Sequence, residues 1–376
     1  MIRLTIPSIE DDDLHAVREA VASGYLVQGP RVAAFEQAVA THVGVKHAVA
    51  VSNCTCALHL ALLALDVRPG DLCVVTAYSW VSTANVIELC GAQPVFVDVH
   101  PETFNLDLNQ LESVLNRLMA NRDTARRVKA VLPVHAFGQM VDMAQLNAIC
   151  GRWNLPVVED AACALGATFH GRQAGAWGTM GCFSFHPRKA VTTGEGGIVT
   201  TDDDALANRV RALRNHGLDP AAAAPDFIMP GHNYRMTEFQ AALGTTQMTK
   251  LSRITSARCA AAGRYDALLA GSPLQSPRLM SGATHVYQSY VTLLPADVAP
   301  RRAELIRQGK EAGVETQIGT IHMPLTTYYR SRYGYRPGEF PATDAVAARA
   351  LTLPLHETIT PAEQETVAGL LTRLLV

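Results

Sequence analysis

One lysine, Lys189, stands between an apolar run and a glycine-rich turn, in the stretch GCFSFHPRKAVTTGEGG at 181–197. The apolar run predicts a buried strand that ends shortly before the lysine, and so a lysine partly withdrawn from water. Desolvation lowers the pKa of a lysine, which favours the unprotonated amine that Schiff-base chemistry needs. An ordinary surface lysine fits the same pattern, so neighbouring strand ends must decide between the two interpretations.

Two acidic residues, Glu159 and Asp160, end a second apolar segment, Val157-Val158. A buried carboxylate is costly unless a cation faces it. An arginine in a structural ion pair is one such cation, and the protonated nitrogen of a pyridine ring is another. From these residues alone both partners stay open.

Small and aromatic residues follow two further strand-like segments. At Asn53-Cys54-Thr55-Cys56 a strand passes into a helical pattern, where backbone N–H groups suit a phosphate or simply an N-cap. Trp80 follows another strand and could stack on a flat ring or belong to the core. Ser184 adds a hydroxyl near Lys189. A phosphate site, a stacking ring, a buried carboxylate and a strand-end lysine together describe a site for pyridoxal phosphate (PLP).

The elements that must position these residues alternate along the chain. Helical patterns are predicted at 55–65, 82–90, 108–118, 143–153 and 204–214. Strands are predicted at 48–51, 72–76, 94–99, 130–134, 156–158, 182–185 and 197–200. Because these strands are nearly continuous apolar runs, they indicate a mainly parallel α/β sheet of seven strands, buried on both faces. Ligands of such sheets bind at the carboxyl ends of the strands.

The flanking regions carry helix signals. Ser8-Ile9-Glu10-Asp11 and Thr237-Glu238-Phe239-Gln240 both look like capping boxes. The first predicts a helix to about residue 23, before a loop at 24–30 and a helix at 31–43. The second predicts a long helix to about residue 269. We therefore expect a large α/β domain at 1–245 and a smaller α+β domain at 246–376, with strands near 286–294 and 314–318.

Composition excludes several classes of protein. The chain has 376 residues, 48% hydrophobic and 18% charged, with a net charge of −2, which offers no basic field for nucleic acid. No apolar run is long enough to span a membrane, and the acidic start MIRLTIPSIEDDD lacks a signal-peptide core. The eight cysteines lack the spacing of a metal site, so we expect buried thiols in a cytoplasmic protein.

Four longer motifs give a resemblance to a known family. The chain resembles the DegT/DnrJ/EryC1/StrS family of PLP-dependent sugar aminotransferases, of fold type I, over nearly its whole length. The motifs are Val158-Glu159-Asp160-Ala161-Ala162, Phe183-Ser184-Phe185-His186-Pro187-Arg188-Lys189 with 193–197, Leu213-Arg214-Asn215-His216-Gly217 and Gly231-His232-Asn233-Tyr234-Arg235-Met236.

The resemblance implies a role for each matching residue. Lys189 would be the Schiff-base lysine, Asp160 the partner of the pyridine nitrogen, and Trp80 the residue stacked on the ring. Asn233 would reach the phosphate of the neighbouring subunit, which implies a homodimer with shared active sites. Ser184 and the backbone at Thr55 and Cys56 would bind the phosphate of their own chain. Segments 25–28 and 319–322 would line the substrate site, and three residues are expected to contact substrate: Tyr25, His186 and His322.

The chain departs from the family pattern at three cysteines. Family members usually read Ser-Gly-Thr-Ala where this chain has Asn53-Cys54-Thr55-Cys56, and they carry Gln or His, on the ring-hydroxyl side, where it has Cys163. A thiol is a weaker hydrogen-bond donor than an amide, so the electronics of the bound cofactor are expected to differ.

The resemblance implies transamination between an amino acid, L-glutamate in most of the family, and a keto sugar attached to a nucleotide. The cofactor would alternate between PLP and pyridoxamine phosphate. Two alternatives stay open: a PLP-dependent dehydratase or aminotransferase variant acting on a sugar or cyclitol, and a PLP-binding regulator without turnover.

Overall fold

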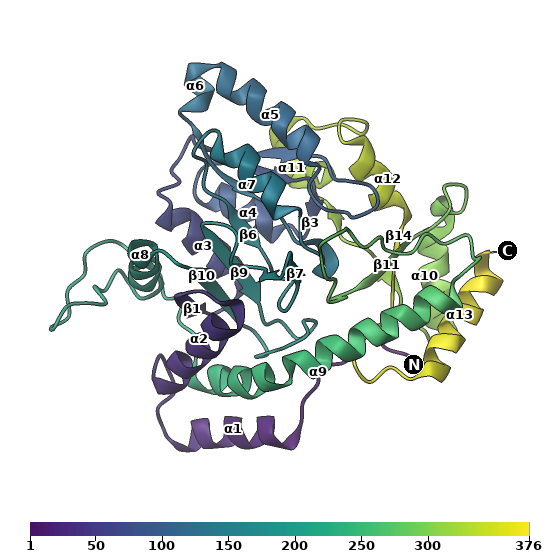
Figure 1. Cartoon of the computed structure of the whole chain (residues 1–376), viewed down its shortest axis with the longest axis horizontal. Helices are drawn as coiled ribbons and strands as arrows, with labels where there is room; N and C mark the ends of the chain where they lie inside the picture. Colours follow the sequence, from purple (N-terminus) through teal and green to yellow (C-terminus); the bar gives the residue numbers. More distant parts are fainter. Residues whose placement is uncertain (376) are drawn as a thin grey trace.

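A computed structural model describes residues 1–375. Seven strands form two adjoining groups at its centre (Figure 1). The four-stranded group has the order β1 (His47–Val51), β10 (Gly197–Thr201), β9 (Met180–Ser184) and β6 (Val158–Asp160), and the three-stranded group has the order β4 (Gln93–Val97), β2 (Leu72–Thr76) and β5 (Val128–Leu132). Parallel bridges at Val131–Val157 and Val134–Asp160 connect β5 with the start and end of β6.

Within these groups only β10 runs against its neighbours. Its first residue, Gly197, therefore lies at the edge where β1 and β9 end, opposite Val51 on one side and Ser184 on the other. One step into the sheet, Asp160 pairs with Cys182. The register thus brings Ser184, Asp160 and the start of the helix after β1 to one edge.

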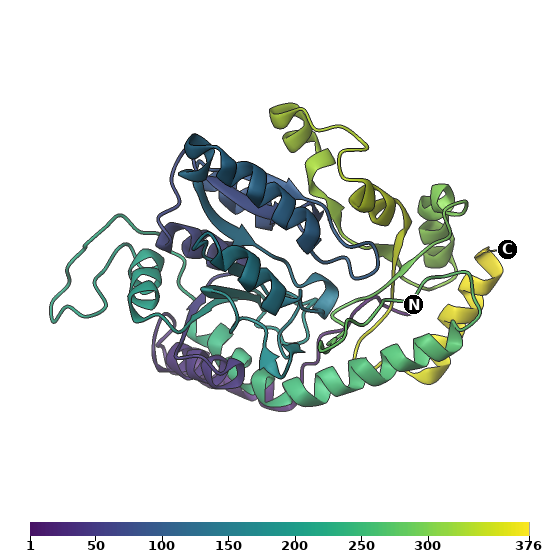
Figure 2. The ribbon, with the colours of Figure 1, turned by 45° about the horizontal axis from the view of Figure 1, so that its top comes forward.

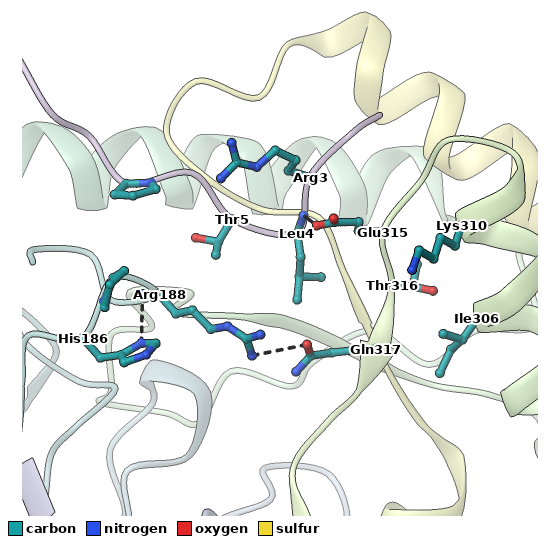
Figure 3. Close-up of a pocket in the computed structure, with 12 residues that line it drawn as sticks. Arg3, Leu4, Thr5, His186, Arg188, Ile306, Lys310, Glu315, Thr316 and Gln317 are labelled. Carbon is teal, nitrogen blue, oxygen red and sulfur yellow. Dashed lines mark hydrogen bonds between the residues drawn. The ribbon is translucent and has the colours of Figure 1, made fainter. Parts of the chain in front are cut away.

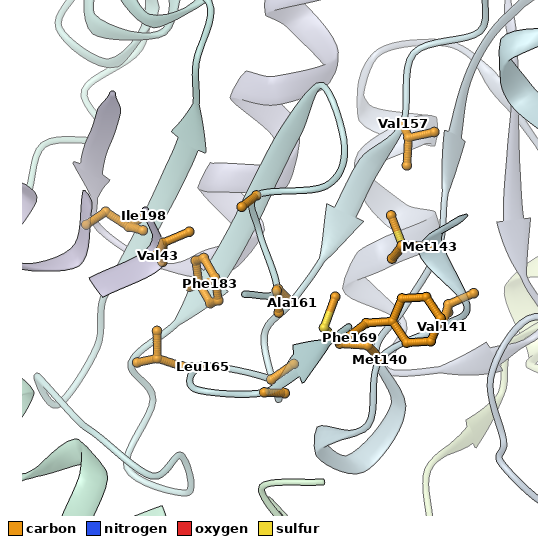
Figure 4. Packing of buried hydrophobic residues seen from close by; sticks show 14 of the residues in the cluster. Val43, Met140, Val141, Met143, Val157, Ala161, Leu165, Phe169, Phe183 and Ile198 are labelled. Atoms are coloured by element: carbon orange, nitrogen blue, oxygen red, sulfur yellow. The ribbon is translucent and has the colours of Figure 1, made fainter. Parts of the chain in front are cut away.

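Side chains alternate between the two faces of the sheet, and each face has its own apolar cluster. One cluster contains Ile198 and Phe183 (Figure 4), and the other contains Val199 and Cys182. Because both faces are covered, all five positions of β2 are buried. The covering helices are α2 (Pro30–Val43), α3 (Cys54–Ala64), α4 (Ser82–Leu89), α5 (Leu108–Ala120), α7 (Met143–Gly151) and α8 (Asp204–Arg214).

Helix α1 (Asp11–Ala22) packs along the first half of α9 (Glu238–Leu268), which runs beneath the sheet toward the C-terminal part (Figure 1). The predicted capping box at Thr237 and Gln240 is confirmed. The box predicted at Ser8 is wrong by two residues, because Glu10 is the N-cap and its amide donates to Asp13 at 2.9 Å. Asp13 is buried in contact with Lys250. This contact fixes the Asp13 side chain where it accepts from the Glu10 amide, so that Glu10 becomes the N-cap.

The C-terminal part contains a three-stranded antiparallel sheet with the order β11 (Tyr290–Leu293), β14 (Ala350–Leu353) and β12 (Gln317–Ile318). Strand β14 was not predicted from the sequence. The N-terminal segment reaches this part, since Ile2 bridges Val314 (Figure 2). Its helices are α10 (Arg302–Glu311), α11 (Thr327–Tyr333), α12 (Pro341–Arg349) and α13 (Pro361–Leu375).

Short elements complete the described chain. The most important for the site is β3 (Tyr78–Ser79), which pairs with β13 (Ile321–His322) and so connects the large sheet to the C-terminal part. The others are α6 (Arg122–Ala125), β7 (Thr168–Phe169), β8 (Arg172–Gln173) and three 3-10 turns at Ala136–Gly138, Ala299–Arg301 and Met323–Leu325. None of the helices in residues 1–375 combines the length and apolarity that a membrane crossing requires.

Candidate active site

Lys189 lies in the turn after β9, where its backbone amide donates to the His186 carbonyl at 2.8 Å. Its Nζ donates to Sγ of Cys163 at 3.1 Å. Burial lowers the pKa of Lys189, but the Cys163 sulfur, Cys54 and Asp160 outweigh it, so that the net pKa lies above its ordinary value. The predicted downward pKa shift is therefore wrong, because desolvation was considered without the sulfur and carboxylate groups that face the amine.

Asp160 ends β6 with its side chain buried. Its Oδ2 accepts a 2.6 Å hydrogen bond from the hydroxyl of Thr83, and its Oδ1 accepts one from the Ala162 amide at 3.2 Å. Burial raises the pKa of Asp160, against the opposing effect of Thr83, Ala162 and Lys189. Within residues 1–375 no arginine or lysine forms an ion pair with it, so a structural ion pair does not explain this carboxylate.

The neighbouring acid, Glu159, has the structural role. It is fully buried and pairs with His135 at 2.8 Å. Its two oxygens also accept hydrogen bonds from the backbone amides of Gly175, Trp177 and Gly178. Because successive strand residues point to opposite faces, the two acids in sequence serve different purposes: Glu159 anchors a loop, while Asp160 stays available at the site.

The start of α3 supplies the proposed phosphate position. Asn53 is the N-cap, and its side chain accepts from the Cys56 amide at 2.9 Å. The amides of Cys54 and Thr55 make no hydrogen bond with any group in the described residues, which leaves them free for an anion. The amide of Cys56, also predicted to bind the phosphate, donates to the Asn53 side chain in this structure.

Gly197 shows why this end of the site is compact. A Cβ atom there would lie 2.3 Å from the carbonyl carbon of Asn53, so only glycine allows the backbone of β10 to approach the start of α3. Ser184, directly opposite Gly197, is half-buried, and its hydroxyl accepts from the His186 amide at 3.4 Å. The hydroxyl and the two free amides thus lie at the same strand edge.

Trp80 follows β3 and exposes 65% of its surface. The alternative that it belongs to the core is therefore wrong. Its carbonyl accepts from the amide of Thr83, three residues on, at 3.3 Å. The turn that holds Trp80 thus also holds the residue that donates to Asp160. An exposed indole beside a strand edge suits stacking on a flat ring.

Sequence reasoning missed Thr83 and understated Cys54. Thr83 looks like one of several small residues in the first turn of α4, and nothing local signals that its hydroxyl meets Asp160. Cys54 was assigned to the phosphate end alone. Burial and the charge of Asp160 raise the pKa of its thiol, and Lys189 and Cys163 also act on it, so Cys54 faces the centre of the site.

The predicted substrate residues lie in different surroundings. His186 is half-buried and lines a cavity beside Lys189; its Nδ1 accepts from the Arg188 amide at 3.2 Å, and burial lowers its pKa. His322 on β13 contacts Asp344 through Nε2 at 3.1 Å, and burial lowers its pKa too. Its Nδ1 is buried without a partner in the described residues.

Two other predicted residues are exposed and do not contact Lys189 within the described chain. Tyr25 lies over Gly29, whose Cβ would meet the tyrosine ring at 2.1 Å. Asn233 accepts from Nε of Arg235 at 2.9 Å.

The comparisons with known proteins agree with this geometry. Residues 7–372 match the model of the DegT/DnrJ/EryC1/StrS aminotransferase family. The chain belongs to this family. It is 35% identical to GDP-perosamine synthase of Caulobacter vibrioides, over all of this chain and 98% of the relative.

Solved structures give the same result. Helicobacter pylori PseC, an aminotransferase involved in the biosynthesis of pseudoaminic acid, superposes with a TM-score of 0.92 at 25% identity, over 100% of this chain and 99% of that one. The PLP-form of Spr1654 from Streptococcus pneumoniae superposes with a TM-score of 0.91 at 25% identity, over 100% of this chain and 98% of that one. The fold is therefore fold type I, mixed α/β, and the protein is a PLP-dependent aminotransferase, as the resemblance implied.

The residues present fit the cofactor. The unpaired amides at Cys54 and Thr55 suit its phosphate, and the close approach that Gly197 permits shapes that end. Asp160, buried without a cationic side chain, suits a protonated ring nitrogen. Lys189, whose amine would hold the cofactor, contacts the thiol of Cys163.

Proposed function

We propose that this family member moves an amino group from L-glutamate to a keto sugar attached to a nucleotide. The observation that carries the proposal is the meeting of Lys189, Cys163 and Asp160 at the edge where β6 and β9 end. The name of the Caulobacter relative, GDP-perosamine synthase, supports a nucleotide-linked sugar for a chain that matches it from end to end.

Each side chain has a defined task in this proposal. PLP, when bound, supplies an aldehyde that takes up the amino group and a ring that disperses the negative charge formed on the substrate carbon. Lys189 Nζ would hold the cofactor at rest and would then move the proton from the donor carbon. Asp160 keeps the proton on the ring nitrogen. Trp80 covers one face of the ring, and Ser184 binds the phosphate with the amides of Cys54 and Thr55.

The remaining predicted residues would contact either the cofactor or the substrate. Cys163 would lie on the ring-hydroxyl side, and His186 and His322 would contact substrate. In a dimer, Asn233 would complete the phosphate site of the partner subunit, and Tyr25 would line the substrate site. The segment between α8 and α9, which projects from the body (Figures 1 and 2) and exposes 63% of Phe227, supports this arrangement.

We also propose a sheet and domain organisation for the chain. We infer that the two strand groups act as one seven-stranded, mainly parallel sheet, because bridges connect β5 with β6. The large PLP-binding domain would comprise residues 1–245 and the smaller one residues 246–376. A cytoplasmic location stays a prediction.

The test has two stages. Purified protein should show the visible absorbance of lysine-bound PLP, and Lys189→Ala should abolish it. L-Glutamate should then bleach that band and release 2-oxoglutarate, and a panel of nucleotide-linked keto sugars, free keto sugars and keto cyclitols should be screened for its return. Mass analysis of the product distinguishes gain of an amine from loss of water. A band that glutamate leaves unchanged would contradict the proposed donor, and a band that no donor bleaches would favour a regulator without turnover.

A further inference from the structure

The amine of Lys189 lies against a thiol that transamination does not consume. Its Nζ donates to Sγ of Cys163 at 3.1 Å. The two residues lie in turns that follow β9 and β6, which are parallel neighbours in the sheet. Hydrogen bonds hold both turns: the Ala164 amide donates to the Ala161 carbonyl at 2.9 Å, and the Lys189 amide donates to the His186 carbonyl at 2.8 Å. The fold therefore positions the amine and the thiol in direct contact.

Cys163 is the cysteine best placed to react with an oxidant. Reactive cysteines are partly exposed and lie beside a cation, whereas buried thiols are inert. Cys163 is half-buried, and it contacts the Lys189 amine. Burial raises the pKa of the other seven thiols, which favours their unreactive protonated form: Cys54, Cys56, Cys73, Cys90, Cys150, Cys182 and Cys259.

Solvent reaches the turn that carries Lys189. The lysine itself is half-buried. His186 and Arg188, on the same turn, line a cavity of about 630 Å³ (Figure 3). A dissolved peroxide is far smaller than this cavity, so it has access to the turn without any unfolding of the chain.

We propose that a peroxide joins Cys163 to Lys189 through a covalent S–N bond, which withdraws the lysine from the cofactor. Sγ attacks one oxygen of hydrogen peroxide, the O–O bond breaks, and Cys163 becomes a sulfenic acid as water leaves. The unprotonated amine of Lys189 then attacks Sγ. The S–O bond breaks, and hydroxide leaves with a proton from the nitrogen as a second water. In total the peroxide is reduced to two molecules of water, and the pair loses two hydrogen atoms.

The cross-link and the cofactor compete for the same nitrogen. In this respect the inference rests on the proposed function, in which Lys189 holds PLP. Bound PLP should therefore protect the pair, and the cross-link should prevent PLP from being captured. Small thiols reverse the reaction. One thiol displaces the lysine amine from sulfur and forms a mixed disulfide with Cys163, and a second thiol releases Cys163 as the disulfide of the two small thiols leaves.

The experiment treats the cofactor-free full-length protein and the PLP-loaded enzyme with hydrogen peroxide, followed by mass spectrometry of the intact chain and of its peptides. We expect the cofactor-free protein to lose two hydrogen atoms and to give a linked pair of peptides that contain Cys163 and Lys189. The PLP-loaded enzyme should give no such pair. Dithiothreitol should restore the original mass and, after PLP is added, the visible absorbance of the bound cofactor.

Three variants test the chemistry of the pair. Cys163→Ser should abolish the cross-link. Lys189→Arg keeps the positive charge but removes the amine, so Cys163 should stop at the sulfenic acid, which dimedone captures. The matched control is Cys259→Ser: this thiol is exposed and donates to the His285 carbonyl at 3.2 Å, so its loss should leave the cross-link unchanged. Thermal melts confirm that the variants are folded.

The outcomes separate this inference from the proposed function. A disulfide between Cys163 and Cys54, or a sulfenic acid that accumulates in the parent without a cross-link, would overturn the inference. Equal cross-linking of the PLP-loaded enzyme would overturn the competition with the cofactor. A parent that forms the cross-link but takes an amino group from no donor contradicts the proposed function alone.

Discussion

The hydroxyl of Thr83 donates a 2.6 Å hydrogen bond to Oδ2 of Asp160, between residues 77 positions apart in sequence. Thr83 is fully buried, and its amide also donates to the carbonyl of Trp80. The partner of the ring nitrogen and the residue that would cover the ring thus share one support. Thr83 is a positioning residue, because it acts on the cofactor only through these two neighbours.

Replacing Thr83 by valine should weaken the interaction between the ionised Asp160 and the protonated ring nitrogen of the cofactor, because Asp160 loses a hydrogen-bond donor. A hydrogen bond to a charged group contributes about 1.5–3 kcal/mol, which corresponds to about 10- to 150-fold weaker binding of pyridoxamine phosphate. Fluorescence titration measures the affinity, and a pH titration of the absorbance of bound cofactor should shift as well. Thr83→Ser, which retains the hydroxyl, is the matched control; a serine variant as impaired as valine would indicate a packing role only.

Replacing Cys163 by alanine should lower the pKa of Lys189 in the cofactor-free protein. The Cys163 sulfur is the foremost group that raises this pKa against burial. The pH profile for the rate of PLP capture should therefore move to lower pH, since more of the amine is unprotonated at a given pH. Cys150→Ala removes a buried core thiol that is not among the groups acting on Lys189, and it should leave the profile in place. An unmoved profile in the Cys163 variant would contradict the importance of the thiol–amine contact.

The two adjacent acids should respond oppositely to neutralisation. Glu159→Gln should destabilise the cofactor-free protein by about 3 kcal/mol in urea unfolding, because it disrupts a buried pair that also accepts three amides. Asp160→Asn should leave stability at pH 7 equal or higher while abolishing turnover.

The sign for Asp160 follows from its raised pKa. A carboxyl with a higher pKa in the folded than in the unfolded state contributes stability below the unfolded pKa, and this contribution is lost as the pH rises through the folded pKa. In Asp160→Asn this side chain no longer titrates, so this decrease in stability with rising pH should be absent. Equal destabilisation by both substitutions would refute the assigned division of roles.

Acid should destabilise the protein partly through His59. This side chain is buried beside His232 and the hydroxyl of Tyr234, and burial lowers its pKa to about 4 from 6.5. Between these pH values His59 is protonated in the unfolded chain but not in the folded one. The stability of the folded state therefore falls as the pH decreases from 6.5 toward 4. The gap corresponds to about 3 kcal/mol. Urea midpoints should fall less steeply over this window in His59→Gln than in the exposed control His15→Gln.

Local patterns predicted much of the fold. The strand at 72–76 and the helix at 204–214 agree with β2 and α8 residue for residue, because uninterrupted apolar runs and clear caps specify them. The C-terminal sheet was predicted only in part. Strands β11 and β12 lie within the segments predicted at 286–294 and 314–318, but β14, which ends just before Pro354, was not predicted. Its paired residues lie 33 to 63 positions away, and such pairing leaves little local signal.

The sequence predicted that several of the proposed site residues lie close together, but it did not predict their electrostatics. Lys189, Asp160 and Ser184 do lie at one strand edge, since the parallel order dictates it. The raised pKa of Lys189 and the donor to Asp160 were not predictable, because both depend on which side chain arrives from a distant segment. Cys163 meets the amine through a turn whose path the sequence pattern does not specify.

The 31-residue helix α9 has a mechanical consequence. It is about 46 Å long if regular. At its first residue the buried Glu238 accepts the amides of Gly29, Arg31 and Val32, beside the Tyr25 loop. In its second half the buried Arg258 donates to carbonyls of the C-terminal part. Because a continuous helix resists bending, any tilt of the C-terminal part would be transmitted along α9 to the loop at its other end.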